Sequence, residues 1–408
     1  MKVAVYAICK NEAAHVARWY ESASEADAIY VLDTGSTDNT CALLEALPKV
    51  QLHTANFVPF RFDIARNMIS NQVPDDFDVA VFLDFDEVLE SGWRTKLEAV
   101  PAPYDSLWFR MIFSRGADGE PDVVYNRLMA HRPHSYIWMY PIHEVLVPQN
   151  PAAALESVTD ITVEHLPDKD KPRSDYLDLL ISAVEEMPHD PRMRQYLGRE
   201  CMYREEWLRA TIHFTQHVTM SDHPDCISES YRYIARCQER VGDTQAAEHA
   251  LLRALSYAPN QREPYAELSS FFQRQQDIER CLAFALSCAS IPENSDYIIR
   301  ERRYYREWPY HMIAWCYNQL GISTLAERYI TMALNMSPDH PQVISDYISL
   351  TGKVPQSLLT KINSGQLSVT DYESTSSRHQ QEDVPSSDST EAEEVPQEVS
   401  NVESSLSS

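Results

Sequence analysis

Glycine is scarce in this sequence, with only 9 among 408 residues. A chain built wholly from α/β units places glycine at many of its turns, so this scarcity indicates a large helical part. The length exceeds what one hydrophobic core usually supports, and two domains with a tail are therefore expected. Hydrophobic residues make up 44% of the chain, which is ample for globular cores.

Basic residues are also in short supply. The chain has 35 Lys and Arg against 61 Asp and Glu, which gives a formal net charge of −26. Ten of the acids but only one base lie in residues 366–408, so −9 of this charge belongs to the C-terminal tail. The rest is still too acidic to hold a polyanion over a broad surface, because phosphate neutralisation needs Lys and Arg. The composition argues against nucleic acid as a partner, although a local basic groove stays compatible with it.

The sequence lacks paired cysteines and long apolar runs. No C-x-x-C pair occurs among the eight cysteines, and most stand in apolar helical contexts, so reduced, buried thiols are expected. No apolar run approaches the length of a membrane span. The N-terminal segment Met1–Ile8 is typical of a strand and is too short for the apolar region of a secretion signal. These absences predict a soluble, cytoplasmic protein.

The first 90 residues alternate between short apolar strands and helices. Strands are expected at Val3–Ile8, Ala28–Leu32, Val50–His53 and Val79–Leu83, and helices at Ala13–Ala26, Cys41–Leu47 and Phe62–Asn71. Clusters of polar residues follow the strands. This pattern is typical of a parallel α/β sheet, which binds its ligands at the carboxyl ends of the strands.

The strand Val79–Leu83 leads directly into three carboxylates, Asp84, Asp86 and Glu87. Like charges this close repel each other, so two ionised Asp residues one position apart usually need a cation between them. Oxygen ligands in small number suit Mg²⁺ or Mn²⁺ held jointly by the protein and a substrate phosphate. The alternative is a strand that ends in a solvated acidic turn.

Four motifs follow one another in this part of the chain: Lys10-Asn11-Glu12, Asp33-Thr34-Gly35-Ser36-Thr37-Asp38, Arg66-Asn67 and Asp84-Phe85-Asp86-Glu87. As a set they resemble the family 2 glycosyltransferases. The resemblance implies a GT-A fold over residues 1–166, which is a Rossmann-like domain with a mainly parallel sheet. It also implies an enzyme, a metal-dependent, inverting hexosyltransferase that uses a nucleotide-diphosphate sugar, with UDP as the expected nucleotide.

By the same resemblance, Asp33 would hydrogen-bond the base of the nucleotide. Lys10, Asn11, Glu12 and Ser36 would line the same donor site. The alternative for Asp33 is an N-cap or turn residue, because Asp commonly accepts backbone hydrogen bonds at such positions.

The resemblance assigns Arg66, Asp84 and Asp86 to the diphosphate and the metal. Arg66 would pair with phosphate through its fork of donors. Asp84 would face the ribose or the metal, and Asp86 would be the direct ligand of Mg²⁺ or Mn²⁺, which acts as a Lewis acid on the departing diphosphate. The alternative for Arg66 is a surface ion pair with one of three nearby acids, Asp63, Asp75 or Asp76.

Further candidates lie between residues 106 and 166, where strands and an aromatic, basic run follow one another. An inverting transfer needs a general base on the acceptor, and Glu144 is the candidate. His165 or His143 would complete the metal shell or bind diphosphate, and Trp138 and Tyr140 would stack on a sugar ring. Packing in the core is the alternative for these histidines and aromatic residues. Many family members take their base from a Glu-Asp pair on a helix, which has no counterpart here, so the base stays open.

The second half of the chain is helical and repetitive. Residues 167–174 form a charged linker, and residues 175–352 carry large, small, Gly, Ala and Pro positions that recur with a period of about 34 residues. This spacing resembles the tetratricopeptide repeat and predicts an all-α solenoid. A solenoid offers a concave surface for a peptide, or it extends the core of the first domain and mediates a homodimer. Residues 353–408 lose apolar periodicity and are expected to form a disordered acidic tail.

A transferase domain followed by such repeats resembles the bacterial peptide S- and O-glycosyltransferases. The sequence therefore predicts transfer of a sugar to a peptide, a lipid-linked glycan or a hydroxymethylated nucleobase. The alternative is a non-catalytic repeat scaffold whose first domain binds a nucleotide without turnover.

Overall fold

The computed structural model describes residues 1–115, 119, 121–151, 154–168, 176–293 and 301–363. The chain divides into two compact units, one from Met1 to Pro188 and one that begins at His189. The predicted linker, residues 167–174, lies mostly outside the described residues. The boundary between the units follows α5 (Leu177–Glu186), a helix that the sequence assigned to the repeats.

The first unit contains a mixed eight-stranded sheet with the strand order β3-β2-β1-β4-β7-β6-β10-β5 and a separate hairpin, β8-β9. The strands are β1 (Val3–Cys9), β2 (Ala28–Asp33), β3 (Val50–Thr54), β4 (Val79–Phe82), β5 (Glu87–Leu89), β6 (Ser106–Arg115), β7 (Pro121–His131), β8 (Tyr136–Met139), β9 (Val145–Pro148) and β10 (Glu156–His165). The helices are α1 (Val16–Ala23), α2 (Thr40–Glu45), α3 (Phe62–Ser70), α4 (Trp93–Ala99) and α5. The α/β class predicted for this part of the chain is confirmed.

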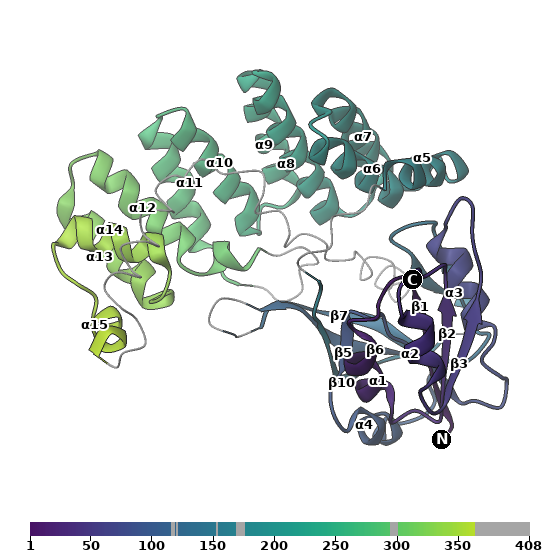
Figure 1. The fold of residues 1–408 in the computed structure, drawn as a ribbon. Coiled ribbons are helices and arrows are strands. Elements are labelled where there is room, and N and C mark those ends of the chain that lie inside the picture. The colour runs from purple at the N-terminus through teal and green to yellow at the C-terminus, as the bar shows by residue number, and fades with distance from the viewer. Residues whose placement is uncertain (116–118, 120, 152–153, 169–175, 294–300, 364–408) are drawn as a thin grey trace. The chain divides into compact units, whose positions relative to one another are not determined.

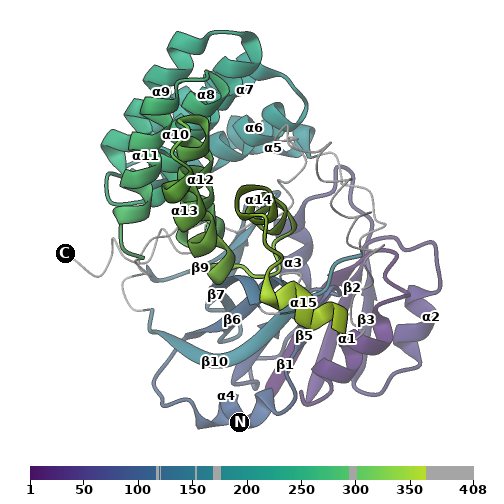
Figure 2. The same cartoon turned by 90° about the vertical axis from the view of Figure 1, so that its left-hand side faces the viewer.

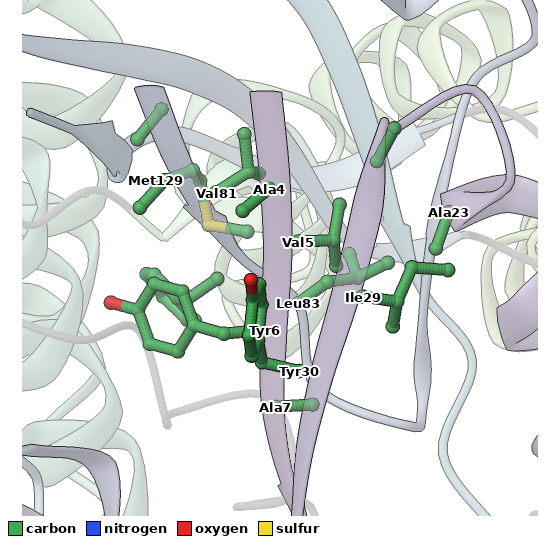
Figure 3. Close-up of a cluster of buried hydrophobic side chains, with 14 of the residues drawn as sticks. Ala4, Val5, Tyr6, Ala7, Ala23, Ile29, Tyr30, Val81, Leu83 and Met129 are labelled. Atoms are coloured by element: carbon green, nitrogen blue, oxygen red, sulfur yellow. The ribbon is translucent and has the colours of Figure 1, made fainter. Parts of the chain in front are cut away.

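The core of this unit forms around β1 and β4, whose residues are apolar at nearly every position. Strands that are covered on both faces need such continuous runs, because neither face meets water. Val5, Ile29 and Val81 come from three neighbouring strands and are all fully buried (Figure 3). β1 pairs in parallel with both β2 and β4.

The second half of the sheet differs from a mainly parallel arrangement. β7 runs antiparallel to both β4 and β6, and β5 runs antiparallel to β10. Among the described residues, the α-helix that joins any of these strands is α4, between β5 and β6. The sheet is therefore parallel on the β3-β2-β1-β4 side and, apart from the parallel pair β6-β10, antiparallel beyond it.

The second unit consists of helices that pack in sequence order (Figures 1 and 2). They are α6 (Pro191–Tyr203), α7 (Trp207–Met220), α8 (Pro224–Val241), α9 (Thr244–Tyr257), α10 (Arg262–Arg274), α11 (Ile278–Ser290), the 3₁₀ helix η2 (Arg302–Tyr305), α12 (Trp308–Gln319), α13 (Ser323–Met336), α14 (Pro341–Thr351) and α15 (Gln356–Asn363). Small residues stand where paired helices cross. A Cβ atom added at Gly198 of α6 would lie 2.8 Å from the ring of Phe214 on α7.

The turn inside each helix pair has the same conformation four times. Glu205, Gly242, Gln276 and Gly321 all have positive φ, between 57° and 84°. In each turn the next residue donates its N–H to the carbonyl five positions earlier, as Asp243 does to Gln238 at 2.9 Å. This is the capping geometry of a helix that ends in a left-handed residue. The recurrence supports tetratricopeptide-like repeats, as the sequence predicted.

The predicted tail needs a correction at its start. Residues 353–363 are not without structure, because α15 forms there and Leu358 is buried in a cluster with Ile344 and Ala314. The rest of the tail lies outside the described residues. Within the described part of the chain, no helix is long and apolar enough to cross a membrane.

Candidate functional site

The loops that follow β1 and β2 are tied together by hydrogen bonds to side chains. Asn11 N–H donates to Ser36 Oγ at 2.8 Å, and Thr37 N–H donates to Asn11 Oδ1 at 2.7 Å. Glu12 N–H donates to Thr40 Oγ1 at 2.8 Å. Asn11 has φ = 58°, a left-handed conformation that Asn tolerates better than most residues. The two loops therefore form one ordered polar frame at the carboxyl ends of β1 and β2.

Asp33 is buried and holds its own loop. Its Oδ2 accepts N–H groups from Gly35 and Ser36, each at 3.0 Å. Burial alone would raise the pKa of Asp33, but hydrogen bonds from Ser36 and Gly35 outweigh this effect and keep the pKa below its ordinary value. This geometry matches the turn interpretation, and a nucleobase would have to use the lone pairs that remain. Lys10, by contrast, is exposed at the end of β1.

The acidic residues after β4 form a tight turn that leads into β5. Glu87 N–H donates to Asp84 O at 3.0 Å, and Asp84 N–H donates to Glu87 Oε2 at 3.1 Å. β5 pairs with β10 so that Glu87 lies opposite His165, and Leu166 N–H donates to Asp86 O at 2.6 Å. This pairing brings His165 to the acidic turn although the two are far apart in the sequence.

Arg66 joins two other predicted site residues. The side chain projects from α3, is almost fully buried, and donates to both oxygens of Asp84 at 2.8 and 3.0 Å. Its Nε donates to Glu144 Oε1 at 2.5 Å. The surface ion pair with Asp63, Asp75 or Asp76 is not formed, because the Arg66 side chain is buried and donates to Asp84 and Glu144 instead. In this arrangement Arg66 binds carboxylates of the protein itself.

Asp86 and His165 face each other. The distance between Asp86 Oδ2 and His165 Nε2 is 3.4 Å, and the Asp86 side chain is 41% exposed. Ligands about 2.1 Å from one ion and at right angles to each other lie about 3 Å apart, so these two atoms fit adjacent positions on a divalent ion. Both oxygens of Asp84 accept hydrogen bonds from Arg66, so a metal at Asp84 would have to use the lone pairs that remain.

The donor set fits an ion that a substrate helps to hold. Across the described residues, no group of three or more His, Cys, Asp or Glu side chains is arranged to bind a metal. A site with two protein ligands is nevertheless usual for Mg²⁺-type ions that are completed by water and substrate phosphates. Asp86 and His165 are the residues that would hold Mg²⁺ or Mn²⁺ here.

Arg127 was not among the residues predicted from the sequence. It lies on β7 and donates to Glu87 Oε1 at 2.5 Å, and its Nη2 is 3.8 Å from Asp84 Oδ2. Burial raises the pKa of Glu87 to about 7, although Arg127 acts in the opposite direction. A charged residue inside the strand Tyr125–Met129 was the available signal, because such a residue needs a partner when it is buried.

Trp138 does not form a platform for a sugar. Trp138 is buried, and its indole N–H donates to Tyr6 Oη at 3.0 Å. One face of the ring is covered by the guanidinium of Arg66, 4.8 Å from the ring centroid. The expectation that Trp138 stacks on a sugar is therefore wrong, because its surface is already used in packing. Tyr140 and His143 both have positive φ, and the His143 ring lies 6.3 Å from the ring of Tyr176.

Comparison with known proteins gives similarity to repeat proteins. No family model matches this chain, and no curated protein matches it. Similar solved structures include MamA, with 17% identity over 40% of this chain and 81% of that chain and a TM-score of 0.33. A thermophilic tetratricopeptide-repeat protein of Thermus thermophilus has 17% identity over 43% and 89%, with a TM-score of 0.32. YrrB, a tetratricopeptide-repeat protein, has 12% identity over 45% and 89%, with a TM-score of 0.33.

These findings correct the family assignment of the first domain. The resemblance of residues 1–166 to family 2 glycosyltransferases, and of the whole chain to peptide glycosyltransferases, is not supported, since no family model and no curated protein matches the chain. The motifs themselves explain why the resemblance was misleading. Polar residues after the strands of a parallel sheet also serve the loops themselves, as Asp33 does for its turn and Asn11 for its neighbouring loop.

Proposed function

We propose that residues 1–166 bind a nucleotide-diphosphate sugar and transfer its glycosyl group to an acceptor, with Mg²⁺ or Mn²⁺ as cofactor and UDP as the expected nucleotide. The proposal rests on one observation. A group of charged and titratable side chains lies beside the carboxyl end of β4: Asp84, Asp86, Glu144, Arg66 and His165. In the strand order β3-β2-β1-β4 the connection reverses direction between β1 and β4. Open α/β sheets bind nucleotides outside such a reversal point.

The charges at this edge suit a diphosphate that arrives with its metal. Lys10 is exposed there and offers a cation to phosphate. A metal bound by Asp86 and His165 would supply Lewis-acid stabilisation to the negative charge of the departing diphosphate. Arg66 fixes Asp84 and Glu144 in place, since it bonds to both. A GT-A arrangement of the donor site belongs to this proposal and not to what has been established of the fold.

Glu144 is proposed as the general base. Its side chain is only 10% exposed and is oriented by Arg66 Nε. One carboxylate oxygen accepts from Arg66, and the other is available to take a proton from an acceptor hydroxyl or thiol within hydrogen-bond reach. Substrate positioning and the electrostatics of the leaving group would supply most of the rate enhancement.

The test is a donor screen with the full chain. The purified protein is incubated with Mn²⁺ and common nucleotide sugars, and released nucleotide and free or transferred sugar are followed by mass spectrometry. We expect one donor to be consumed, and D86N to lose at least about a hundredfold in turnover. The matched control is D76N, an Asp-to-Asn change in the same unit at a surface side chain that is 67% exposed, and it should keep wild-type turnover.

The result also separates this proposal from a non-catalytic scaffold. A protein that consumes no donor, and whose thermal stability does not change with UDP and Mn²⁺, contradicts nucleotide-sugar binding. A protein that is stabilised by UDP and Mn²⁺ but consumes no donor supports the scaffold alternative.

Peptide binding by the helical unit is the second candidate function. The repeated helix pairs favour it, since stacked pairs present an extended surface to a partner. The solved structure of YrrB has an unusual peptide-binding site, which is a property of that protein. Fluorescence anisotropy of the full chain with a labelled peptide library tests peptide binding here, and the absence of binding to any member at micromolar protein would contradict it.

A further inference from the structure

Arg127 is a buried arginine that contacts two members of the acidic turn. Its side chain is 12% exposed, whereas the carboxylate of Glu87 that it binds is 4% exposed. The same guanidinium lies 3.8 Å from Asp84 Oδ2. A carboxylate as deeply buried as Glu87 is costly unless a cation and hydrogen bonds compensate it. Arg127 therefore offsets part of the free-energy cost of burying the Glu87 carboxylate.

The guanidinium groups of Arg127 and Arg66 both pack against the ring of Phe82. The Arg127 guanidinium carbon is 4.5 Å from the ring centroid of Phe82, and that of Arg66 is 5.3 Å from the same centroid. Phe82 is fully buried and is the last residue of β4. Because both guanidinium groups rest on one rigid ring, their positions relative to the following turn are fixed.

The two arginines bind two of the three carboxylates of the turn and leave the third to other partners. Asp84 is held by Arg66 through both oxygens, and Glu87 is held by Arg127. Asp86 lies between them in the sequence, and its side chain faces His165 and solvent. Glu87 also accepts the N–H of Asp84, so its position controls the backbone of the turn.

We propose that Arg127 is a positioning residue for the candidate site: by holding Glu87 and Asp84 it fixes the 84–87 turn so that Asp86 faces His165. The part that concerns turnover rests on the proposed function, whereas the part that concerns the geometry of the turn does not. Residues that hold a metal ligand in place typically change metal affinity or activity by about 10- to 100-fold when they are replaced.

The geometry is tested by NMR without metal or substrate. The side-chain imidazole resonances of His165, assigned with an H165N variant, are compared at a single pH in wild type, R127M, R127K and the double variant E87Q/R127M. The double variant removes the buried charge of Glu87 together with its partner, so it should fold even if R127M does not. E87Q alone is the reference for the double variant, because loss of the Glu87 charge can itself move these resonances. We expect the His165 resonances of E87Q/R127M to differ from those of E87Q, and those of R127K to stay near wild type.

Identical His165 resonances in E87Q and E87Q/R127M would overturn the proposal, because Arg127 would then serve only to neutralise Glu87. The second measurement is a Mn²⁺ titration followed by electron paramagnetic resonance, in which the double variant should bind at least about tenfold more weakly. Turnover adds a third measurement: kcat should fall about tenfold or more while KM for the donor changes less than about twofold. A wild-type protein without turnover contradicts the proposed function alone, since the NMR comparison still decides the role of Arg127.

Discussion

At the scale of single residues, Arg66 is the centre of the candidate site. It forms charge-assisted hydrogen bonds with Asp84 and Glu144 and packs against the ring of Trp138. Only 5% of its surface is exposed, so both carboxylates meet a cation that water scarcely screens. An arginine is suited to this position because its planar fork serves two carboxylates at once, which a lysine ammonium does with poorer geometry.

Replacement of Arg66 should therefore cost both stability and function. R66A leaves Asp84 and Glu144 without their cation, and we expect the free energy of unfolding to fall by about 3–5 kcal/mol. Urea unfolding followed by tryptophan fluorescence measures this change. K2A is the control, because it removes an exposed pair with Asp76 that should contribute less than about 1 kcal/mol. A loss in R66A no larger than in K2A would contradict the assigned role.

Most residues of the site were predictable from the sequence, but their partners were not. Asp84, Asp86 and Glu87 stand at the end of an apolar strand, which is where a sheet presents polar groups. Arg66 donates two hydrogen bonds to Asp84. This pairing depends on how α3 packs against the sheet, and no local sequence pattern encodes that packing. Arg127 was missed for the same reason, because its partner Glu87 is brought close only by strand pairing.

At the scale of elements, the turns of the helix pairs show how unevenly a repeat uses glycine. Gly242 and Gly321 occupy the left-handed position in two turns, whereas Glu205 and Gln276 occupy it in the other two. A residue with a Cβ atom is strained there by about 1 kcal/mol or more. The low glycine content of the chain thus reflects helices, as expected, and also turns that tolerate this strain.

The turn at Gln276 offers a direct test. Q276G should raise the free energy of unfolding by about 0.5–1 kcal/mol, because glycine relieves the strain at φ = 57° at some cost in unfolded-state entropy. The neighbouring Q275G is the matched control: Gln275 has helical φ, so glycine should destabilise there by up to about 1 kcal/mol. Chemical unfolding followed by circular dichroism compares the two. Equal signs for the two changes would contradict the explanation.

Gly198 tests the crossing of two helices in the same unit. In G198A the added Cβ would lie 2.8 Å from the ring of Phe214, so one helix must shift or the ring must turn. We expect a destabilisation of about 1–3 kcal/mol. The double variant G198A/F214L, which gives the methyl group room, should recover part of this loss in the same unfolding measurement. No recovery would indicate that the steric explanation is wrong.

The parallel half of the sheet was easier to predict than the antiparallel half. Continuous apolar runs such as Val79–Phe82 identify buried strands by themselves. β5, by contrast, is only three residues long and begins with Glu87, so neither its length nor its composition marks it as a strand. Its existence depends on pairing with β10, a contact between distant parts of the chain.

At the scale of the whole molecule, a buried histidine with a lowered pKa occurs in each of the two units. His131 lies in the first unit with Nε2 2.9 Å from Tyr6 Oη, and His217 lies in the second with Nδ1 2.8 Å from Ser230 Oγ. Both are almost fully buried. Burial lowers the pKa of each from its ordinary value of 6.5 to about 4, because the charged form loses its hydration.

Both units should therefore lose stability as the pH falls from about 6.5 to about 4. In this range the unfolded chain binds a proton on each histidine and the folded chain does not, so acidification favours unfolding. A shift from 6.5 to about 4 corresponds to roughly 3 kcal/mol for each site when the pH has passed both pKa values.

Hydrogen exchange followed by mass spectrometry reads the two units separately in one sample. H217N should flatten the pH dependence of protection in the helical unit and leave that of the first unit unchanged, and H131N should do the reverse. The comparison concerns the slope against pH, so a uniform loss of stability in either variant does not affect it. A slope that persists in the helical unit of H217N would show that other groups, such as carboxylates in ion pairs, carry its acid sensitivity.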